Sequence, residues 1–145
     1  MTKITEIWSD GSYRQQPRTA GAGWVIHHAD GQIVERQQSL PRLRDSLAYG
    51  SQIAELEAAM LALNEVSAEL PVILHMDCEM ALQSLRHSKL IITPKTPAPA
   101  LQSAFRKAAE AVARHPSVTL MISSDRFDRH MGLAHRLSRQ ASAPV

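Results

Sequence analysis

The sequence has very little cysteine, few aromatic residues and no long apolar run. Cys78 is the single cysteine among 145 residues, so no disulfide can form within the chain, and we expect a reducing, cytoplasmic location. No apolar stretch reaches the roughly 20 residues that a membrane-spanning helix needs. The opening MTKITEIWSD lacks the apolar segment of a signal peptide. These absences argue against a disulfide-stabilised secreted domain and against a membrane partner.

Net charge is also small. The 16 basic and 14 acidic residues leave a formal charge of +2, which many proteins without a nucleic-acid partner share. The content of 44% apolar and 21% charged residues is typical of a folded globular protein. The length predicts a single domain over residues 1–145, and we expect a monomer, with a dimer as the alternative. Arginines gather in two segments, which we interpret as solvated faces: Arg36, Arg42 and Arg44, then Arg126, Arg129, Arg136 and Arg139.

Hydrophobic patterning predicts five strands and four helices. The predicted strands cover residues 4–9, 23–28, 32–40, 71–77 and 118–123, and the predicted helices cover residues 50–66, 78–86, 101–114 and 131–141. An Asp-Gly pair at residues 30–31 joins the second and third strands as a hairpin. Strands that first follow one another and then alternate with helices predict an α/β fold, with an antiparallel and a parallel side to one sheet. Residues 87–100 form a proline-rich loop, and the tail to residue 145 is expected to be frayed.

Two acids stand at the ends of predicted strands. Asp10 follows the first strand, and Asp77 closes the fourth. Ligands gather outside the carboxyl ends of strands in open α/β sheets, so parallel neighbours would bring these carboxylates face to face. On the helical wheel Glu55 lies at the edge of the apolar arc and points toward the sheet rim. Glu57 and Glu65 lie on the opposite, solvated side. The alternative is that Glu55 is only a boundary residue of an amphipathic helix.

Three converging carboxylates imply a cation. Without one they would repel and raise one another's pKa, whereas oxygen-rich clusters of this kind hold Mg²⁺ or Mn²⁺. A pair of such ions roughly 4 Å apart can clamp the attacking and leaving oxygens of a phosphodiester hydrolysis.

Three motifs carry a family resemblance over nearly the whole chain. SDGS…AGAGWVI, GSQIAELEAAMLAL and VILHMDCEMAL together resemble the type 1 ribonuclease H family. The resemblance implies a five-stranded mixed sheet, three antiparallel strands followed by two parallel ones, flanked by helices. It also implies cleavage of RNA strands paired with DNA, with two Mg²⁺ or Mn²⁺ ions. Asp10, Glu55 and Asp77 match the first three catalytic, metal-holding acids of the family.

The resemblance extends to substrate contacts. We expect Gly11 and Ser12 to contact the nucleic acid. Ser51 and Gln52 stand before Glu55, where the family places asparagines that touch the minor groove of the hybrid, and both can hydrogen-bond to 2′-hydroxyls. The proline-rich segment after residue 86 suggests that the optional basic handle of the family is missing or reduced.

The last predicted helix departs from the family pattern. In MGLAHRLSRQA, His135 stands where the family has its fourth catalytic acid. In one interpretation His135 is a neutral metal ligand or proton carrier, which would shift preference toward Mn²⁺. In the other it is an ordinary interfacial histidine and the fourth position is lost. The preceding SSDRFDRH offers His130, Asp125 or Asp128 in place of the family's histidine loop, without a clear match.

Two functions remain open on these residues. The first is a metal-dependent endonuclease, a hydrolase acting on the RNA of RNA–DNA hybrids. The alternative is a catalytically weak or inactive module that keeps the fold and binds nucleic acid. An integrase- or exonuclease-like relative is a third possibility, but those groups arrange their acids differently.

Overall fold

The computed structural model describes residues 4–15, 18–40, 49–91 and 98–143. These residues form one five-stranded sheet in the order β3-β2-β1-β4-β5. The strands are β1 (Thr5–Gln15), β2 (Arg18–His27), β3 (Ile33–Leu40), β4 (Val72–Met76) and β5 (Val118–Ile122). The helices are α1 (Gly50–Glu65), α2 (Glu79–Arg86), α3 (Pro99–Ala113) and α4 (Arg129–Ala141). The antiparallel side is β3-β2-β1 and the parallel side is β1-β4-β5, so the predicted mixed sheet is confirmed.

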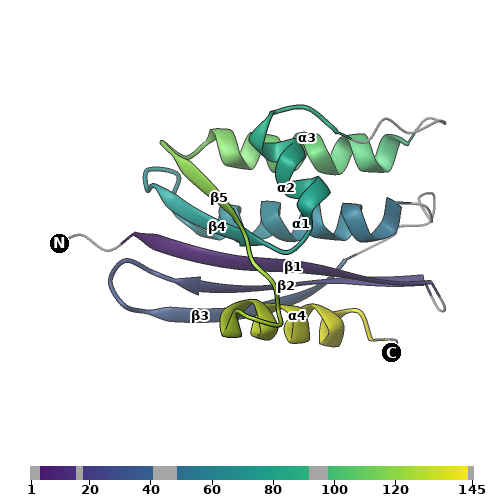
Figure 1. Cartoon of the computed structure of the whole chain (residues 1–145), viewed down its shortest axis with the longest axis horizontal. Coiled ribbons are helices and arrows are strands. Elements are labelled where there is room, and N and C mark those ends of the chain that lie inside the picture. The colour runs from purple at the N-terminus through teal and green to yellow at the C-terminus, as the bar shows by residue number, and fades with distance from the viewer. Residues whose placement is uncertain (1–3, 16–17, 41–48, 92–97, 144–145) are drawn as a thin grey trace.

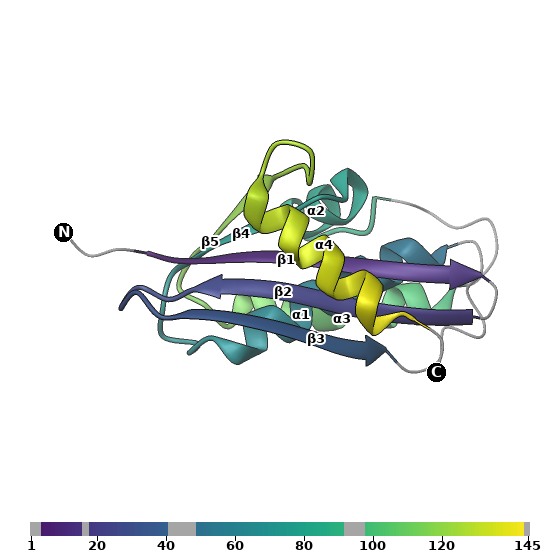
Figure 2. The ribbon, with the colours of Figure 1, turned by 90° about the horizontal axis from the view of Figure 1, so that it is seen from below.

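The helices cover the sheet unequally on its two faces. Helix α1 packs on β1 and β2, and α3 packs on α1, so one face carries two layers of helix (Figure 1). The other face carries α4, which crosses β1, β2 and β3 diagonally (Figure 2). None of the described helices is both long and apolar enough to cross a membrane.

Strand β1 sends alternate side chains to these two faces, as the pleat requires. Ile7 belongs to the large core beneath α1 and α3. Trp8 belongs to a smaller cluster with residues of β2 and α4. In β2 the AGAG stretch follows the same rule, because its alanines enter the large core and its glycines lie under α4. A Cβ on Gly23 would stand 2.4 Å from the carbonyl oxygen of Ala134, so glycine is what allows α4 to approach this closely.

The predicted end of the first strand was wrong. We expected the strand to stop at Ser9, before an Asp-Gly-Ser turn, but β1 continues to Gln15 and β2 begins at Arg18. Asp10 and Gly11 are therefore paired strand residues, opposite Gly23 and Ala22. The prediction failed because residues that favour turns also suit a strand that is closely approached by helices on both faces.

Other boundaries shift by one or two residues. Helix α3 begins at Pro99, since proline suits a first helical turn. Helix α4 begins at Arg129, because the Asp128 side chain caps it. The tail predicted to be frayed includes Ser142, which is buried and accepts a hydrogen bond from Arg14. Residues 144–145 and residues 92–97 of the proline-rich segment lie outside the described residues.

Candidate active site

The candidate site lies where β4 stops and β1 continues. The parallel ladder between these strands ends with Ser9 paired to Met76. Asp10 is the next residue on β1, and Asp77 is the next residue after β4. The two acids therefore follow the last rung of one parallel pair, as the sequence predicted, although Asp10 lies within its strand. Beyond this rung β1 has no parallel neighbour among the described strands, which leaves this edge open to another element.

Helix α1 takes that place because Gly11 has no side chain. A Cβ on Gly11 would lie 2.2 Å from the carbonyl carbon of Ala54 and 2.4 Å from the nitrogen of Glu55. Because α1 lies this close to β1, Glu55 is placed near Asp10. Glu55 is 7% exposed, and its Oε2 atom has no hydrogen-bond partner among the described residues. A buried carboxylate oxygen without a partner is costly.

Helix α4 holds the other carboxylate from the opposite face of the sheet. Asp10 Oδ2 lies 2.9 Å from Nδ1 of His135 and accepts a hydrogen bond of 2.8 Å from the Ser138 hydroxyl. Asp10 and Ser138 are buried, whereas the His135 side chain is 42% exposed. Ser138 was missed in the sequence. Its signal is its spacing, since residues three apart share a helix face.

Burial and neighbouring negative charge raise the pKa of two of these acids, Glu55 and Asp77. Burial raises the pKa of Glu55 well above its usual value, the charge of Asp10 and a hydrogen bond with Asp10 raise it further, and the Gly11 N–H opposes them. Burial also raises the pKa of Asp77, followed by the charges of Asp10 and Asp125, while His135 opposes them. In the absence of a cation, Glu55 and Asp77 therefore hold their protons to higher pH than ordinary carboxyl groups do.

The chemistry of these side chains fits a hard divalent cation, but their arrangement is not a finished metal site. Among the described residues, no three His, Cys, Asp or Glu side chains are grouped so that they could hold an ion as they stand. Asp10 Oδ2 accepts a hydrogen bond from Ser138 of α4 and lies 2.9 Å from Nδ1 of His135, and Asp77 is exposed. A bound cation would displace the protons from these carboxyl groups. It would give the Glu55 oxygen a partner and offset the burial and charge repulsion that raise the pKa values.

Comparison with known proteins decides the family. The RNase H family model matches residues 2–123, which is most of the chain. The protein belongs to the RNase H family. The match ends before α4, the helix that contains His135. No curated protein matches the sequence.

Solved RNase H structures share the fold. RNase H1 from the halophilic archaeon Halobacterium salinarum has 21% sequence identity and a TM-score of 0.73, covering 96% of this chain and 97% of its own. The N-terminal RNase H domain of a Mycobacterium tuberculosis protein has 19% identity and a TM-score of 0.75, covering 97% and 100%. LC11-RNase H1, isolated from compost and solved in complex with an RNA/DNA hybrid, has 21% identity and a TM-score of 0.66, covering 96% and 99%.

The residues predicted to contact substrate divide into two groups in this RNase H chain. Ser12 is buried and accepts a hydrogen bond of 3.3 Å from the Ser142 hydroxyl, while Gly11 packs against α1. Ser51 is exposed and Gln52 half-buried, both in the first turn of α1. Ser51 and Gln52 are thus accessible, and the Ser12 side chain serves packing between β1 and the end of α4.

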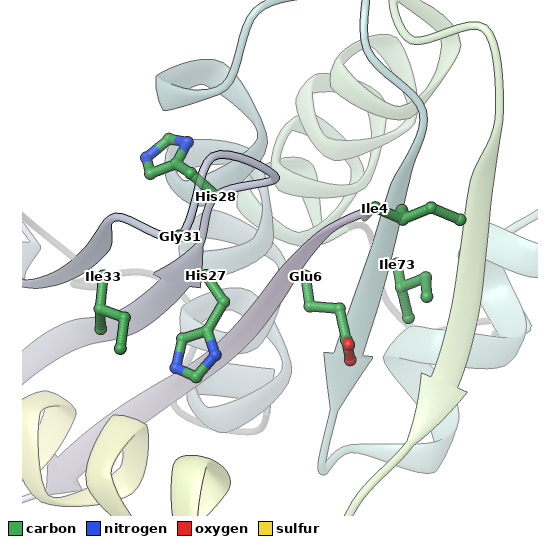
Figure 3. Close-up of a pocket in the computed structure, with 7 residues that line it drawn as sticks. All are labelled: Ile4, Glu6, His27, His28, Gly31, Ile33 and Ile73. Atoms are coloured by element: carbon green, nitrogen blue, oxygen red, sulfur yellow. The ribbon is translucent and has the colours of Figure 1, made fainter. Parts of the chain in front are cut away.

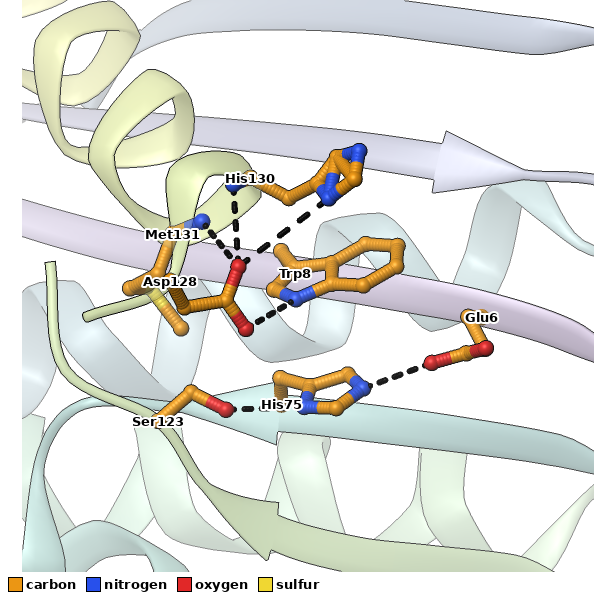
Figure 4. Close-up of polar contacts among 7 residues, drawn as sticks. All are labelled: Glu6, Trp8, His75, Ser123, Asp128, His130 and Met131. Carbon is orange, nitrogen blue, oxygen red and sulfur yellow. Dashed lines mark hydrogen bonds and ion pairs between the residues drawn. The ribbon is translucent and has the colours of Figure 1, made fainter.

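The loop between β5 and α4, where the RNase H family has its histidine, is fixed by a polar network (Figure 4). Asp128 Oδ2 accepts a 2.9 Å hydrogen bond from the Trp8 indole, and Oδ1 accepts the backbone N–H groups of His130 and Met131. Burial would raise the pKa of Asp128, but these hydrogen bonds lower it overall. The His130 ring packs on Trp8 with its centroid 4.5 Å away. Asp128 is therefore a helix cap, and His130 a packing residue beside it.

A second strand histidine completes this network. The His75 ring stacks on Trp8 at 4.6 Å, with one nitrogen 2.8 Å from Glu6 and the other 2.8 Å from the Ser123 hydroxyl. Within the described loop, Asp125 is the acid whose charge reaches Asp77.

Another pocket lies elsewhere in the described structure. Its volume is about 530 Å³, and it is bounded by the start of β1, the β2–β3 hairpin and β4 (Figure 3). The lining residues are Ile4, Glu6, His27, His28, Gly31, Ile33 and Ile73. Its one acid, Glu6, already pairs with His75. This pocket contains none of the acids that match the RNase H motif.

Proposed function

We propose that this RNase H family member is a metal-dependent endonuclease that hydrolyses the RNA strand of RNA–DNA hybrids. The observation that carries the proposal is the convergence of Asp10 and Glu55: α1 lies directly against Gly11, the neighbour of Asp10, and the charge of Asp10 raises the pKa of the buried Glu55. The RNA/DNA hybrid in the LC11-RNase H1 structure supports the same substrate for this chain.

The chain's own residues would have distinct roles. Asp10, Glu55 and Asp77 would hold Mg²⁺ or Mn²⁺, and His135 would join them as a ligand or proton carrier. Two such ions, when bound, supply Lewis acidity to the scissile phosphate and lower the pKa of the attacking water. Ser138 would hold Asp10 in one orientation through its 2.8 Å hydrogen bond. Ser51 and Gln52 would contact 2′-hydroxyls of the RNA strand.

Two observations favour a second function. His135 already occupies the Asp10 oxygen that a cation would need, and no ready three-ligand group exists among the described side chains. A protein of this kind could bind hybrids without useful turnover.

Cleavage of end-labelled oligonucleotides separates the two functions. We expect the purified protein to cut the RNA of a hybrid with Mg²⁺ or Mn²⁺, to stop in EDTA, and to leave duplex DNA intact. Asp10→Asn and Glu55→Gln should abolish cleavage. Glu57→Gln, on the same helix but paired with Lys107 at 3.8 Å, is the matched control and should cut normally. Hybrid binding without cleavage in saturating Mn²⁺ would reject the enzyme in favour of the binding module.

A further inference from the structure

Phe127 is the most exposed large apolar side chain in the described part of the chain. It is 87% exposed and lies in the turn between β5 and α4. A pocket of about 370 Å³ adjoins it, lined by Asp77, Ile122, Ser123, Ser124, Phe127 and Asp128. Pockets of this volume lie within the range that holds small ligands. An aromatic ring at the mouth of a pocket that also contains a proposed metal ligand is placed to contact the substrate.

The turn that carries Phe127 is held at both ends. The Ser124 carbonyl accepts the backbone N–H groups of Phe127 and Asp128, at 3.1 and 2.9 Å. Asp128 is fixed by the Trp8 indole. Ser123 is fixed by His75 and by its backbone N–H, which donates to the Met76 carbonyl at 2.8 Å. Because the turn is already ordered, a ligand that binds Phe127 does not bear the entropic cost of ordering it.

One arginine lies beside the Phe127 ring. The Arg126 guanidinium carbon is 5.7 Å from the centre of the ring, and Arg126 forms no ion pair with an acid among the residues described. Of the two acids that line the adjoining pocket, Asp77 is a proposed metal ligand, and Asp128 accepts hydrogen bonds from Trp8 and from the start of α4. An aromatic ring beside an unpaired arginine can stack on a base while the arginine neutralises a phosphate.

We propose that Phe127 stacks on an unpaired base next to the phosphate bound at the carboxylate site, so that the protein prefers hybrids that adjoin a single-stranded segment. In a continuous duplex each base is already stacked on both faces, and extruding one costs free energy. A base at a single-stranded junction has a free face. This inference rests on the proposed nuclease function, and it adds a substrate preference to it.

The test compares two probes on a cleavage-deficient Asp10→Asn background. One probe is a blunt RNA–DNA hybrid, and the other is the same hybrid with a short unpaired extension that carries 2-aminopurine at its first base. Stacking on an aromatic side chain contributes about 5- to 150-fold in affinity per base. We expect the extended probe to bind tighter by a factor in that range, with quenching of 2-aminopurine fluorescence. Phe127→Ala should remove both effects and Phe127→Trp should restore them.

The control is Ile33→Ala, which shortens another exposed apolar side chain (58% exposed) at the distant pocket. It should leave both probes unaffected. Blunt-hybrid binding without a preference for the extension, or a preference that survives in Phe127→Ala, overturns the inference and leaves the nuclease proposal standing. A Phe127→Ala effect confined to self-association, measured by light scattering, overturns it in favour of a protein interface. If wild type neither binds nor cleaves any hybrid, both proposals are overturned.

Discussion

Replacing Glu55 by glutamine should make the metal-free protein more stable at neutral pH. The two side chains have nearly the same shape, so the substitution removes the negative charge and leaves the packing under Asp10 intact. Glu55 is 7% exposed and one of its oxygens has no partner among the described residues. Ionised Glu55 therefore loses hydration, and it also faces Asp10, so burial and that charge raise its pKa. A neutral amide avoids both costs.

The size and sign of the effect follow from proton linkage. A free glutamate titrates near 4.5, whereas folded Glu55 keeps its proton to higher pH. Above 4.5 the unfolded chain thus binds fewer protons than the folded chain, and wild-type stability falls as pH rises until the folded pKa is reached. Each pH unit in that window costs up to about 1.4 kcal/mol, so the roughly 2.5 units up to pH 7 set a ceiling of about 3.4 kcal/mol. We expect Glu55→Gln to be more stable than wild type at pH 7, by no more than this ceiling.

Urea unfolding followed by tryptophan fluorescence would measure the difference. In EDTA the advantage of Glu55→Gln should be near zero at pH 4.5 and grow toward pH 7. Mg²⁺ or Mn²⁺ at 100 times its dissociation constant should add about 2.7 kcal/mol to wild type and much less to the variant. Glu57→Gln should show neither behaviour, since Glu57 lies in an ion pair with Lys107. A Glu55→Gln protein that is less stable than wild type at pH 7 without metal would refute the reasoning.

Substitutions at three further positions, His135, His115 and Gly11, test other parts of the structure, with Gly132→Ala as a control. His135→Ala should lower the initial rate of hybrid cleavage and His135→Asp should retain or raise it in Mg²⁺ and Mn²⁺; equal rates in wild type and His135→Ala would remove this residue from the site. His115 is buried with its two ring nitrogens 2.9 and 3.1 Å from backbone carbonyl oxygens, so His115→Leu should lower the free energy of unfolding by about 1–3 kcal/mol in urea; an unchanged midpoint would contradict this. Gly11→Ala places a methyl group 2.2 Å from the Ala54 carbonyl carbon and should cost at least about 1–3 kcal/mol and abolish cleavage. Gly132→Ala, whose new Cβ would meet only one atom at 3.5 Å, should melt at or above the wild-type temperature.

The fold was predictable because its periodicities are strong. The run at residues 72–76 is a buried parallel strand flanked by β1 and β5, and it reads as a nearly continuous apolar segment. Helix α1 carries its apolar residues at helical spacing and buries them against the sheet. In both cases the spacing of the apolar residues shows which positions are buried. The type and order of the elements could therefore be predicted from the sequence.

The boundary at Asp10 was not predictable in the same way. Asp-Gly-Ser favours a turn when only local preferences are considered. In the structure Gly11 is a strand residue, because α1 lies against it. Gly11 is needed because it contacts α1, a segment more than 40 residues away in the sequence. A single sequence does not show which distant segment a glycine contacts. The same long-range contact places Glu55 near Asp10, so the strand boundary and the position of Glu55 have one cause.

The part of the site contributed by α4 depends on register more than on residue type. Even-numbered residues of β1 face α4, so Trp8, Asp10 and Ser12 meet Asp128, Ser138 and Ser142 in turn. If β1 had ended at Ser9, as the local residues suggested, the strand would not direct the Asp10 side chain toward α4. Ser138 would then lack Asp10 as a hydrogen-bond acceptor. In a strand that continues to Gln15, every second side chain faces α4. The side chains of α4 that face the strand are then in position to form all three contacts. The hydrogen bond that orients Asp10 is therefore a consequence of the same register that seats α4 on the sheet, and a variant that disturbs that register should lose both.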